Sequence, residues 1–222
     1  MKKKQFVVIG LGRFGTSVAK TLYSLGNDVL AIDKDEDLVQ EIADSVTHAV
    51  QMDATDENAL RTLGLRNFDV GVVTIGANIQ SSIMATLLIK EFGVKYIVAK
   101  GNSEIHAKVL TKIGADRVVL PEKDMGVRVA HNLVSASILD YIELSPEYSI
   151  MEIKVLEEWA NKPLRDIKLR SKYGINIMAI KKENEINLTP SADDLISPND
   201  IIVAIGASEE LGKLEGLIVE VK

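Results

Sequence analysis

Residues 6–15, together with Asp33, constrain the fold of this chain more than any other segment. The ten residues read Phe-Val-Val-Ile-Gly-Leu-Gly-Arg-Phe-Gly, an apolar run that ends in Gly-x-Gly-x-x-Gly. A helical pattern follows, and then a second apolar run that ends in the carboxylate of Asp33. This succession of strand, glycine turn, helix, strand and acid is typical of a dinucleotide-binding domain.

Each position in the segment has a physical role in such a domain. Gly10 permits the tight turn, Gly12 lets a pyrophosphate approach the backbone, and Gly15 lets the helix pack against the strand. The phosphate then meets a helix N-terminus, whose free N–H groups and dipole favour an anion. Asp33 accepts hydrogen bonds from ribose hydroxyls. A glycine turn in an ordinary α/β domain is the alternative reading, but it leaves the acid 18 residues after Gly15 unexplained.

Composition narrows the class of protein. The chain has 222 residues, 46% of them apolar, which is enough for one large domain or two small ones. Its net charge of −6 argues against a nucleic-acid partner, because neutralising phosphates needs a basic face. The lysines at residues 2–4 precede only four apolar residues before the glycines, so we expect a strand there and no targeting segment. No stretch approaches the roughly 20 apolar residues of a membrane span, and we expect a cytoplasmic protein.

The first 121 residues alternate between strand and helix patterns, and residues 70–75 are apolar enough for a strand buried on both faces. We predict an α/β fold, a Rossmann-like doubly wound parallel sheet, in a nucleotide-binding domain over residues 1–122. The predicted helices cover residues 17–25, 36–44, 56–63, 78–92 and 103–113. The predicted strands cover residues 6–9, 29–33, 49–53, 70–75, 96–99 and 117–120.

The pattern changes after residue 122. A helix is predicted over residues 123–139 without a parallel strand after it, so we assign residues 123–140 to a connecting helix. A half-buried strand, a short helix, a hairpin, a further strand and a closing helix follow at 148–155, 163–172, 175–188, 201–205 and 208–217. Residues 141–222 are therefore predicted to form a smaller α+β domain.

Catalytic groups are not evident. An oxidoreductase on this scaffold needs an acid or base directed at the nicotinamide. The three histidines, His48, His106 and His131, lie in no recognisable catalytic context and share no metal-ligand spacing. There is no cysteine. We predict a nucleotide-binding module that is not an enzyme.

Six short motifs in a fixed order carry a resemblance to a known family. They are Val-Ile-Gly-Leu-Gly-Arg-Phe-Gly at 8–15, Asp-Ala-Thr at 53–55, Gly-Leu-Arg-Asn-Phe-Asp at 64–69, Ile-Gly-Ala-Asn at 75–78, Lys-Ile-Gly-Ala-Asp at 112–116 and Pro-Glu-Lys-Asp at 121–124. Together they resemble the RCK-domain regulatory subunits of Ktr and Trk potassium-uptake systems, of the KtrA/KtrC type within the TrkA family. Residues 148–153, 169–177 and 200–203 resemble the C-terminal RCK subdomain. Met52 departs from the pattern, since relatives often have glycine there.

The resemblance implies a cytoplasmic regulatory subunit at the inner face of the cell membrane. Such subunits form dimers that assemble into octameric rings on a membrane-embedded potassium transporter, of the KtrB, KtrD or TrkH type. ATP and ADP, with NAD(H) and cyclic di-AMP as further ligands, change the shape of the ring and gate the transporter. The C-terminal domain is then a ligand-binding and dimerisation domain.

The predicted nucleotide site lies where the strands of the first domain end. Gly10, Gly12 and Gly15 hold the phosphates, Asp33 holds the ribose, and residues 53–55 border the adenine. The full set is Gly10, Gly12, Arg13, Phe14, Gly15, Asp33, Lys34, Asp53, Ala54, Thr55, Ile75, Gly76 and Lys100.

Two charged residues receive more specific roles. Arg13 stands inside the glycine loop, and we expect its guanidinium to bind the terminal phosphate of ATP, across a dimer interface or within one subunit. Glu122 would be repelled by a triphosphate unless a cation lay between them, which predicts Mg²⁺ or Ca²⁺. The plainer readings are a solvent-facing arginine and a carboxylate favoured by a helix dipole.

The resemblance also implies a cyclic di-AMP site in the second domain. Arg170 would pair with a phosphate, Asn176 would read a base edge, and Ile167, Ile177 and Pro190 would pack on the purines. By composition alone, the two isoleucines read as core residues and Arg170 as a surface charge.

Two other function classes remain open from the sequence. One is an NAD-dependent oxidoreductase of Rossmann type, which requires turnover of NADH. The other is a redox-sensing transcription factor with a Rossmann core, which requires salt-dependent DNA binding and a basic face.

Overall fold

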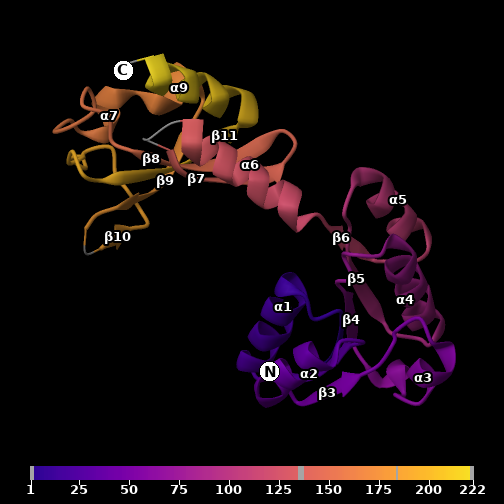
Figure 1. The fold of residues 1–222 in the computed structure, drawn as a ribbon. Coiled ribbons are helices and arrows are strands. Elements are labelled where there is room, and N and C mark those ends of the chain that lie inside the picture. Colours follow the sequence, from indigo (N-terminus) through magenta and orange to yellow (C-terminus); the bar gives the residue numbers. More distant parts are fainter. Residues whose placement is uncertain (1–2, 135–137, 184, 221–222) are drawn as a thin grey trace. The chain divides into compact units, whose positions relative to one another are not determined.

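The protein consists of two compact units, Met1–Glu122 and Lys123–Lys222 (Figure 1). The computed structural model describes residues 3–134, 138–183 and 185–220. No helix within these ranges is both long enough and apolar enough to span a bilayer.

The N-terminal unit contains a six-stranded parallel sheet in the order β3-β2-β1-β4-β5-β6. This confirms the predicted doubly wound fold. Its strands are β1 (Gln5–Ile9), β2 (Asp28–Asp33), β3 (His48–Gln51), β4 (Val70–Val73), β5 (Tyr96–Lys100) and β6 (Arg117–Val119). Its helices are α1 (Arg13–Ser24), α2 (Glu36–Ile42), α3 (Glu57–Arg61), α4 (Ile79–Glu91) and α5 (Glu104–Lys112), and short 3-10 helices cover Ala43–Ser45 and Leu65–Asn67.

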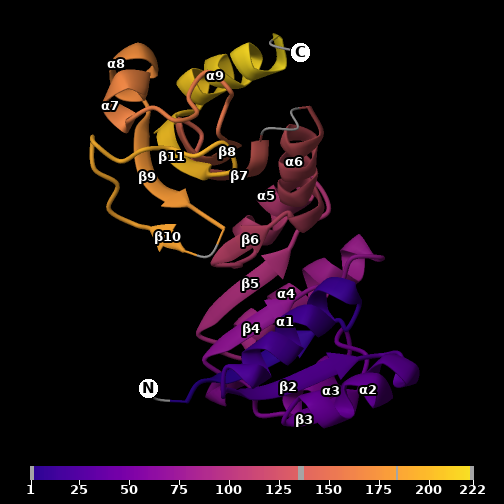
Figure 2. The ribbon, with the colours of Figure 1, turned by 90° about the vertical axis from the view of Figure 1, so that its left-hand side faces the viewer.

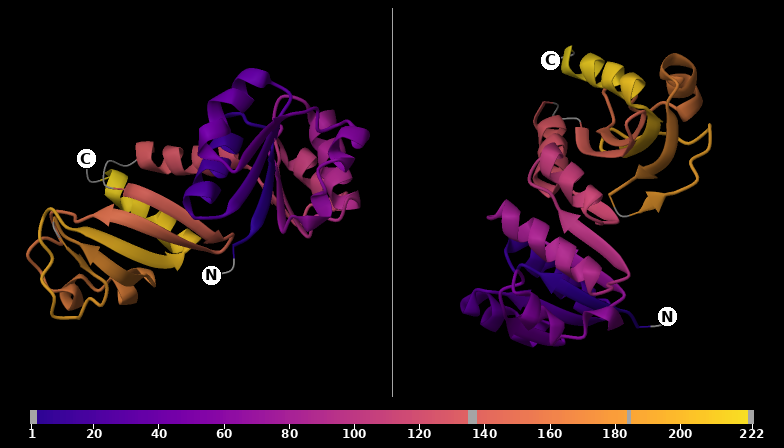
Figure 3. Two further views of the ribbon diagram at one scale, coloured as in Figure 1. Left: turned by 90° about the horizontal axis from the view of Figure 1, so that it is seen from below. Right: turned by 90° about the vertical axis from the view of Figure 1, so that its right-hand side faces the viewer.

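Helices cover both faces of this sheet, as the left panel of Figure 3 shows. Along β1, Val8 joins the core under α1 and α2, while Val7 and Ile9 join the core under α3, α4 and α5. Because both faces are buried, the central strands β1, β2 and β4 carry apolar runs instead of alternating with polar residues. The sheet therefore leaves only its edges and strand ends for a ligand.

Helix ends follow the sequence signals. The side chains of Asn78 and Ser103 accept hydrogen bonds from the first turns of α4 and α5, as N-caps do. The predicted start of the first helix at residue 17 was wrong, because α1 begins at Arg13. Its first turn is built from the glycine motif itself, where apolar periodicity gives no helical signal.

The C-terminal unit contains an antiparallel sheet in the order β10-β9-β11-β8-β7. The strands are β7 (Ile138–Ser145), β8 (Tyr148–Lys154), β9 (Asn176–Lys181), β10 (Ile186–Asn187) and β11 (Ile201–Ala207). The helices of this unit are α6 (Pro121–Val134, whose first two residues belong to the N-terminal unit), α7 (Leu164–Ile167), α8 (Leu169–Tyr173) and α9 (Ser208–Glu220). Figure 2 shows α7, α8 and α9 gathered beside this sheet. Alternate residues of β8 and β11, such as Met151 and Ile202, form its core.

Two predictions for this half need correction. The connecting helix was predicted to extend through residue 139, but α6 ends at Val134 and β7 starts at Ile138; residues 135–137 lie outside the described part. The apolar residues of 138–144 pair with β8, with Tyr141 opposite Met151. The helix predicted over residues 163–172 is two short helices, separated by Lys168 in the left-handed conformation at φ 57°.

Candidate functional site

A cavity of about 310 Å³ lies at the carboxyl ends of β1, β2, β3 and β4. The strand order reverses direction between β1 and β4, and this switch point is where open α/β sheets bind ligands. The cavity is lined by Ile9, Gly10, Gly12, Ile32, Asp33, Lys34, Asp35, Leu38, Met52, Asp53, Ala54, Thr74, Ile75, Gly76, Ala77, Asn78 and Ser81.

The glycine loop has the geometry that its sequence predicts. Gly10 has φ 95°, which disfavours any other residue. A Cβ on Gly15 would lie 1.9 Å from the carbonyl oxygen of Gly10, so only glycine lets α1 start this close to the loop. A Cβ on Gly12 would have no neighbour within 4 Å. The loop at Gly12 is thus open to a ligand. Gly10 and Gly15, in contrast, are needed for the conformation and the close packing of the loop backbone.

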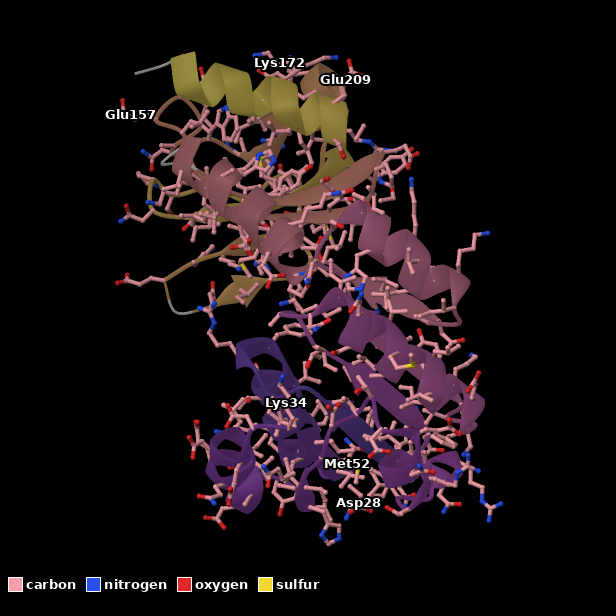
Figure 4. All side chains as sticks on the ribbon, turned by 45° about the vertical axis from the view of Figure 1, so that its right-hand side comes forward. Asp28, Lys34, Met52, Glu157, Lys172 and Glu209 are labelled. Carbon is pink, nitrogen blue, oxygen red and sulfur yellow. The ribbon has the colours of Figure 1, made fainter. Side chains whose placement is uncertain are left out.

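Asp33 joins β2 to the glycine loop. One of its carboxylate oxygens accepts the backbone N–H of Leu11 at 2.5 Å, and the other accepts the N–H of Asp35 at 3.0 Å. Each oxygen keeps a lone pair for a further donor. The carboxylate can therefore hold the loop and still accept a ribose hydroxyl. Figure 4 labels two cavity residues, Lys34 and Met52, and also Asp28 at the other end of β2.

The cavity brings together eight of the thirteen predicted nucleotide-site residues: Gly10, Gly12, Asp33, Lys34, Asp53, Ala54, Ile75 and Gly76. The other five, Arg13, Phe14, Gly15, Thr55 and Lys100, do not line it. Arg13 is the exposed first residue of α1, and Gly15 is buried behind the loop.

Thr55 acts on the cavity through Asp53. Its hydroxyl and its backbone N–H donate to the same oxygen of Asp53, at 2.7 and 2.9 Å. The hydroxyl bond is the main reason that the pKa of Asp53 is lowered, followed by the backbone bond. Asp53 is thereby held as an ionised carboxylate with a fixed orientation at the mouth of the cavity.

Lys100 and Glu122 form an ion pair beside the cavity, with 2.5 Å between Nζ and the nearer carboxylate oxygen. The Lys100 hydrogen bond is the largest cause of the lowered pKa of Glu122, and the charge of Arg13 contributes in the same direction. Lys100 is mostly buried and Glu122 is exposed. Among the described residues, no group of three or more His, Cys, Asp or Glu side chains is placed to hold a metal ion.

Sequence reasoning missed several cavity residues, notably Leu38, Thr74, Asn78 and Ser81. Thr74 was a readable signal, because it is the one polar residue of the apolar run 70–75. It is buried, and its hydroxyl donates to the carbonyl oxygen of Gly10 at 2.6 Å. Met52, noted only as a departure from the family pattern, lines the cavity directly.

A second cavity, of about 580 Å³, lies in the C-terminal unit. It is lined by Leu164, Arg165, Lys168, Leu169, Arg170, Ser171, Ile175, Asn176, Ile177 and Ala192. Of the five residues predicted for a second ligand, Arg170, Asn176 and Ile177 line it. Ile167 belongs to the hydrophobic core, and Pro190 lies two residues before the cavity residue Ala192.

Comparison with known families identifies both halves of the chain. Residues 6–121 match the TrkA-N domain, and residues 150–219 match the TrkA-C domain. The chain belongs to the Ktr/TrkA family of potassium-uptake proteins. Within this family it is 49% identical to Ktr system potassium uptake protein C of Bacillus subtilis, over 99% of this chain and 100% of that protein. It is 46% identical to Ktr system potassium uptake protein A of the same organism, over 97% of each chain.

A solved structure with a similar fold covers nearly all of this Ktr/TrkA chain. The GsuK channel bound to NAD superimposes with a TM-score of 0.66 at 16% identity, covering 98% of this chain and 40% of that chain. At this identity the likeness concerns the fold.

Proposed function

We propose that this chain is the regulatory subunit of a Ktr-type potassium-uptake system and gates its membrane-embedded subunit, of the KtrB, KtrD or TrkH type, in response to ATP and ADP. The cavity at the β1–β4 switch point carries the proposal, because it combines an open glycine loop with the carboxylate of Asp33. The chain has no catalytic role in this scheme. It acts from the cytoplasmic face of the membrane through its partner, as dimers assembled into an octameric ring.

In this proposal the phosphates lie against Gly10 and Gly12, and Asp33 binds the ribose. The adenine packs between Met52, Ala54 and Leu38, which supply apolar surface on the β2–β3 side of the cavity. Thr55 fixes Asp53 at the adenine edge. The carboxyl ends of β4 and β5, with Ile75, Gly76 and Lys100, bound the phosphate side. NAD(H) is a further candidate for the same site.

Arg13 reads the terminal phosphate. It is the first residue of α1 and exposed, so its guanidinium is free to contact a phosphate of its own subunit or of a neighbour. A guanidinium binds a phosphate through two parallel hydrogen bonds. Loss of the γ-phosphate then removes these bonds, and ATP and ADP stabilise different arrangements of the ring.

Glu122 contributes to a divalent cation site, for Mg²⁺ or Ca²⁺. In the structure its carboxylate neutralises Lys100. A triphosphate near Lys100 competes for that charge, and a cation between Glu122 and the phosphate oxygens restores the balance. A two-fold axis brings the second carboxylate from the neighbouring subunit.

The second cavity is proposed to bind cyclic di-AMP at a dimer interface. Arg170 and Lys168 supply cations for the phosphates, Asn176 reads a base edge, and Ile177 packs on a purine. Ile167 supports this wall from the core, and Pro190 closes it from the following loop.

One calorimetric experiment tests the central proposal. The full chain is titrated with ATP, ADP, NADH and cyclic di-AMP, with and without Mg²⁺ or Ca²⁺. We expect saturable binding of ATP and ADP, and an Arg13→Ala variant in which the ratio of the two affinities moves toward one. Arg61→Ala, an exposed arginine paired with Glu57, is the matched control. Absence of adenine-nucleotide binding contradicts the proposal, and steady oxidation of NADH with a small-molecule substrate favours an oxidoreductase instead.

A further inference from the structure

His106 is a buried polar side chain in the N-terminal unit that the proposed ligand contacts do not use. It lies in the first turn of α5 and is 3% exposed. Its Nε2 atom is buried and has no hydrogen-bond partner among the described residues. A buried polar atom without a partner destabilises a fold, so the imidazole must supply something that an apolar side chain cannot.

The other ring nitrogen of His106 makes a hydrogen bond that an apolar side chain cannot make. Nδ1 of His106 accepts the backbone N–H of Asn102 at 3.2 Å. Because that backbone N–H is always a donor, Nδ1 carries no proton, and the neutral ring has its proton on Nε2. Burial also lowers the pKa of His106, which favours the same neutral form. The histidine thus acts as a fixed hydrogen-bond acceptor for Asn102.

Asn102 connects this acceptor to the nucleotide cavity. Its side-chain amide donates to the carbonyl oxygen of Gly76 at 2.5 Å, and Gly76 lines the cavity. The three residues come from different segments: the loop after β4, the loop after β5, and the first turn of α5. His106 therefore fixes the backbone of Asn102, and Asn102 fixes the loop that carries Gly76.

Capping of α5 accounts for only part of this arrangement. Ser103 already caps the helix, since its hydroxyl oxygen accepts the backbone N–H of His106 at 3.2 Å. Asn102 precedes the N-cap, and its side chain donates to a loop 26 residues earlier in the chain, outside α5. Beside it, Nζ of Lys100 lies 3.6 Å from where a Cβ of Gly76 would stand, so the same loop also borders the Lys100–Glu122 ion pair.

We propose that His106 and Asn102 are positioning residues of the nucleotide site, which hold the Gly76 loop in the conformation that receives the phosphates. The inference rests on the proposed nucleotide-binding function and adds two residues that do not touch the ligand. Without the pair, the Gly76 loop samples other conformations, and binding must order it again.

The test compares three single variants and one double variant of the full chain by calorimetric titration with ATP and ADP. Asn102→Ala removes the bond to Gly76. His106→Leu removes the hydrogen-bond acceptor and fills its place with an apolar side chain. We expect each to weaken both nucleotides by about three- to tenfold, as the loss of one hydrogen bond does. His106→Asn keeps an oxygen at the place of Nδ1 and should restore affinity to within about twofold of wild type. The Asn102→Ala/His106→Leu double variant should be no weaker than the worse single variant, because the two residues act in series.

Two controls separate the outcomes. His48→Asn, at an exposed histidine outside the cavity, should bind as wild type does. Asp33→Ala should lose affinity whether or not the pair positions the loop. If wild type binds and Asp33→Ala does not, but Asn102→Ala binds normally, the positioning role is wrong while the nucleotide site stands. If wild type itself binds no nucleotide, the proposed function fails and this inference fails with it. Should His106→Leu fail to fold, Asn102→Ala still tests the bond to Gly76, and a clear loss of affinity in His106→Asn would contradict the proposed acceptor role.

Discussion

The two units line their cavities with opposite charges. The N-terminal cavity carries three carboxylates and one lysine, namely Asp33, Asp35, Asp53 and Lys34. The C-terminal cavity carries Arg165, Lys168 and Arg170, and no acidic side chain among the described residues that line it. Both are proposed to hold phosphate-bearing ligands, so they must recognise phosphate by different means.

The strand arrangement explains the difference. In the parallel sheet, the strand ends converge on a glycine loop and a helix N-terminus, so in the proposed site backbone N–H groups receive the phosphates and side-chain carboxylates are left for sugar hydroxyls. The antiparallel sheet offers no such convergence, and side-chain cations must supply the charge. If both proposed sites hold phosphates, a phosphate site need not be basic where the backbone provides the donors. Three predictions test this contrast and a fourth tests the stability of the N-terminal unit, in order from the largest expected effect to the smallest.

Two alanine substitutions in the glycine loop should have different effects, one on the stability of the fold and the other on nucleotide binding. Gly15→Ala places a Cβ 1.9 Å from the Gly10 carbonyl oxygen and should lower the free energy of unfolding of the N-terminal unit by about 3 kcal/mol or more. Gly12→Ala meets nothing within 4 Å and should change it by less than about 0.5 kcal/mol. Urea titration measures both, and calorimetry should show that Gly12→Ala nevertheless loses nucleotide affinity. Equal destabilisation by the two changes would contradict this account of the loop.

Asp33→Ala should reduce ATP and ADP affinity by about a hundredfold, because it removes charged hydrogen bonds to the ribose and to Leu11. Asp28→Ala is the matched control, at the other end of the same strand and paired with Lys3 at the surface. Fluorescent-nucleotide titration is sufficient to measure both. A hundredfold loss from Asp28→Ala as well would point to a general effect on β2.

Arg170→Ala should weaken cyclic di-AMP binding by about tenfold, since one cation of the C-terminal cavity is lost. Arg165 pairs with Asp193, whereas Arg170 has no ion-pair partner among the described residues. Raising the salt concentration from 0.05 to about 0.5 M should weaken this ligand more than ADP, because salt screens the charge of side-chain cations, whereas neutral backbone donors carry no net charge to screen. If salt weakened the binding of cyclic di-AMP and of ADP equally, the proposed difference in how the two units bind phosphate would be wrong.

The smallest expected effect is a change of stability with pH in the N-terminal unit. Burial lowers the pKa of His106 in the folded state, so the unfolded chain binds a proton first as the pH falls. The stability that neutral His106 contributes is therefore complete above the ordinary histidine pKa near 6.5. It is lost as the pH falls through the lowered folded value. Urea unfolding between pH 7.5 and 5 should show this loss in wild type and in His48→Asn, and a smaller loss in His106→Asn.

The sequence alone determined the parallel sheet, the N-cap of α5, and the roles of Gly10 and Gly15. These features depend on neighbours within a few residues: apolar runs, glycines that permit one backbone conformation, and side chains that cap the next turn. The switch-point cavity also followed, because a motif that ends one strand and an acid that ends the next must meet at the same sheet edge.

Tertiary structure alone decided the rest. β7 exists because residues 138–145 find β8 as a partner, and the local pattern there is equally compatible with a helix. Ile167 lies in the core and not in the C-terminal cavity, because the left-handed turn at Lys168 rotates the chain between α7 and α8. The contact of His106 with Asn102, and of Asn102 with Gly76, joins segments whose spacing in the sequence carries no signal. Local chemistry fixes which elements form, whereas side chains that meet across loops depend on how those elements pack.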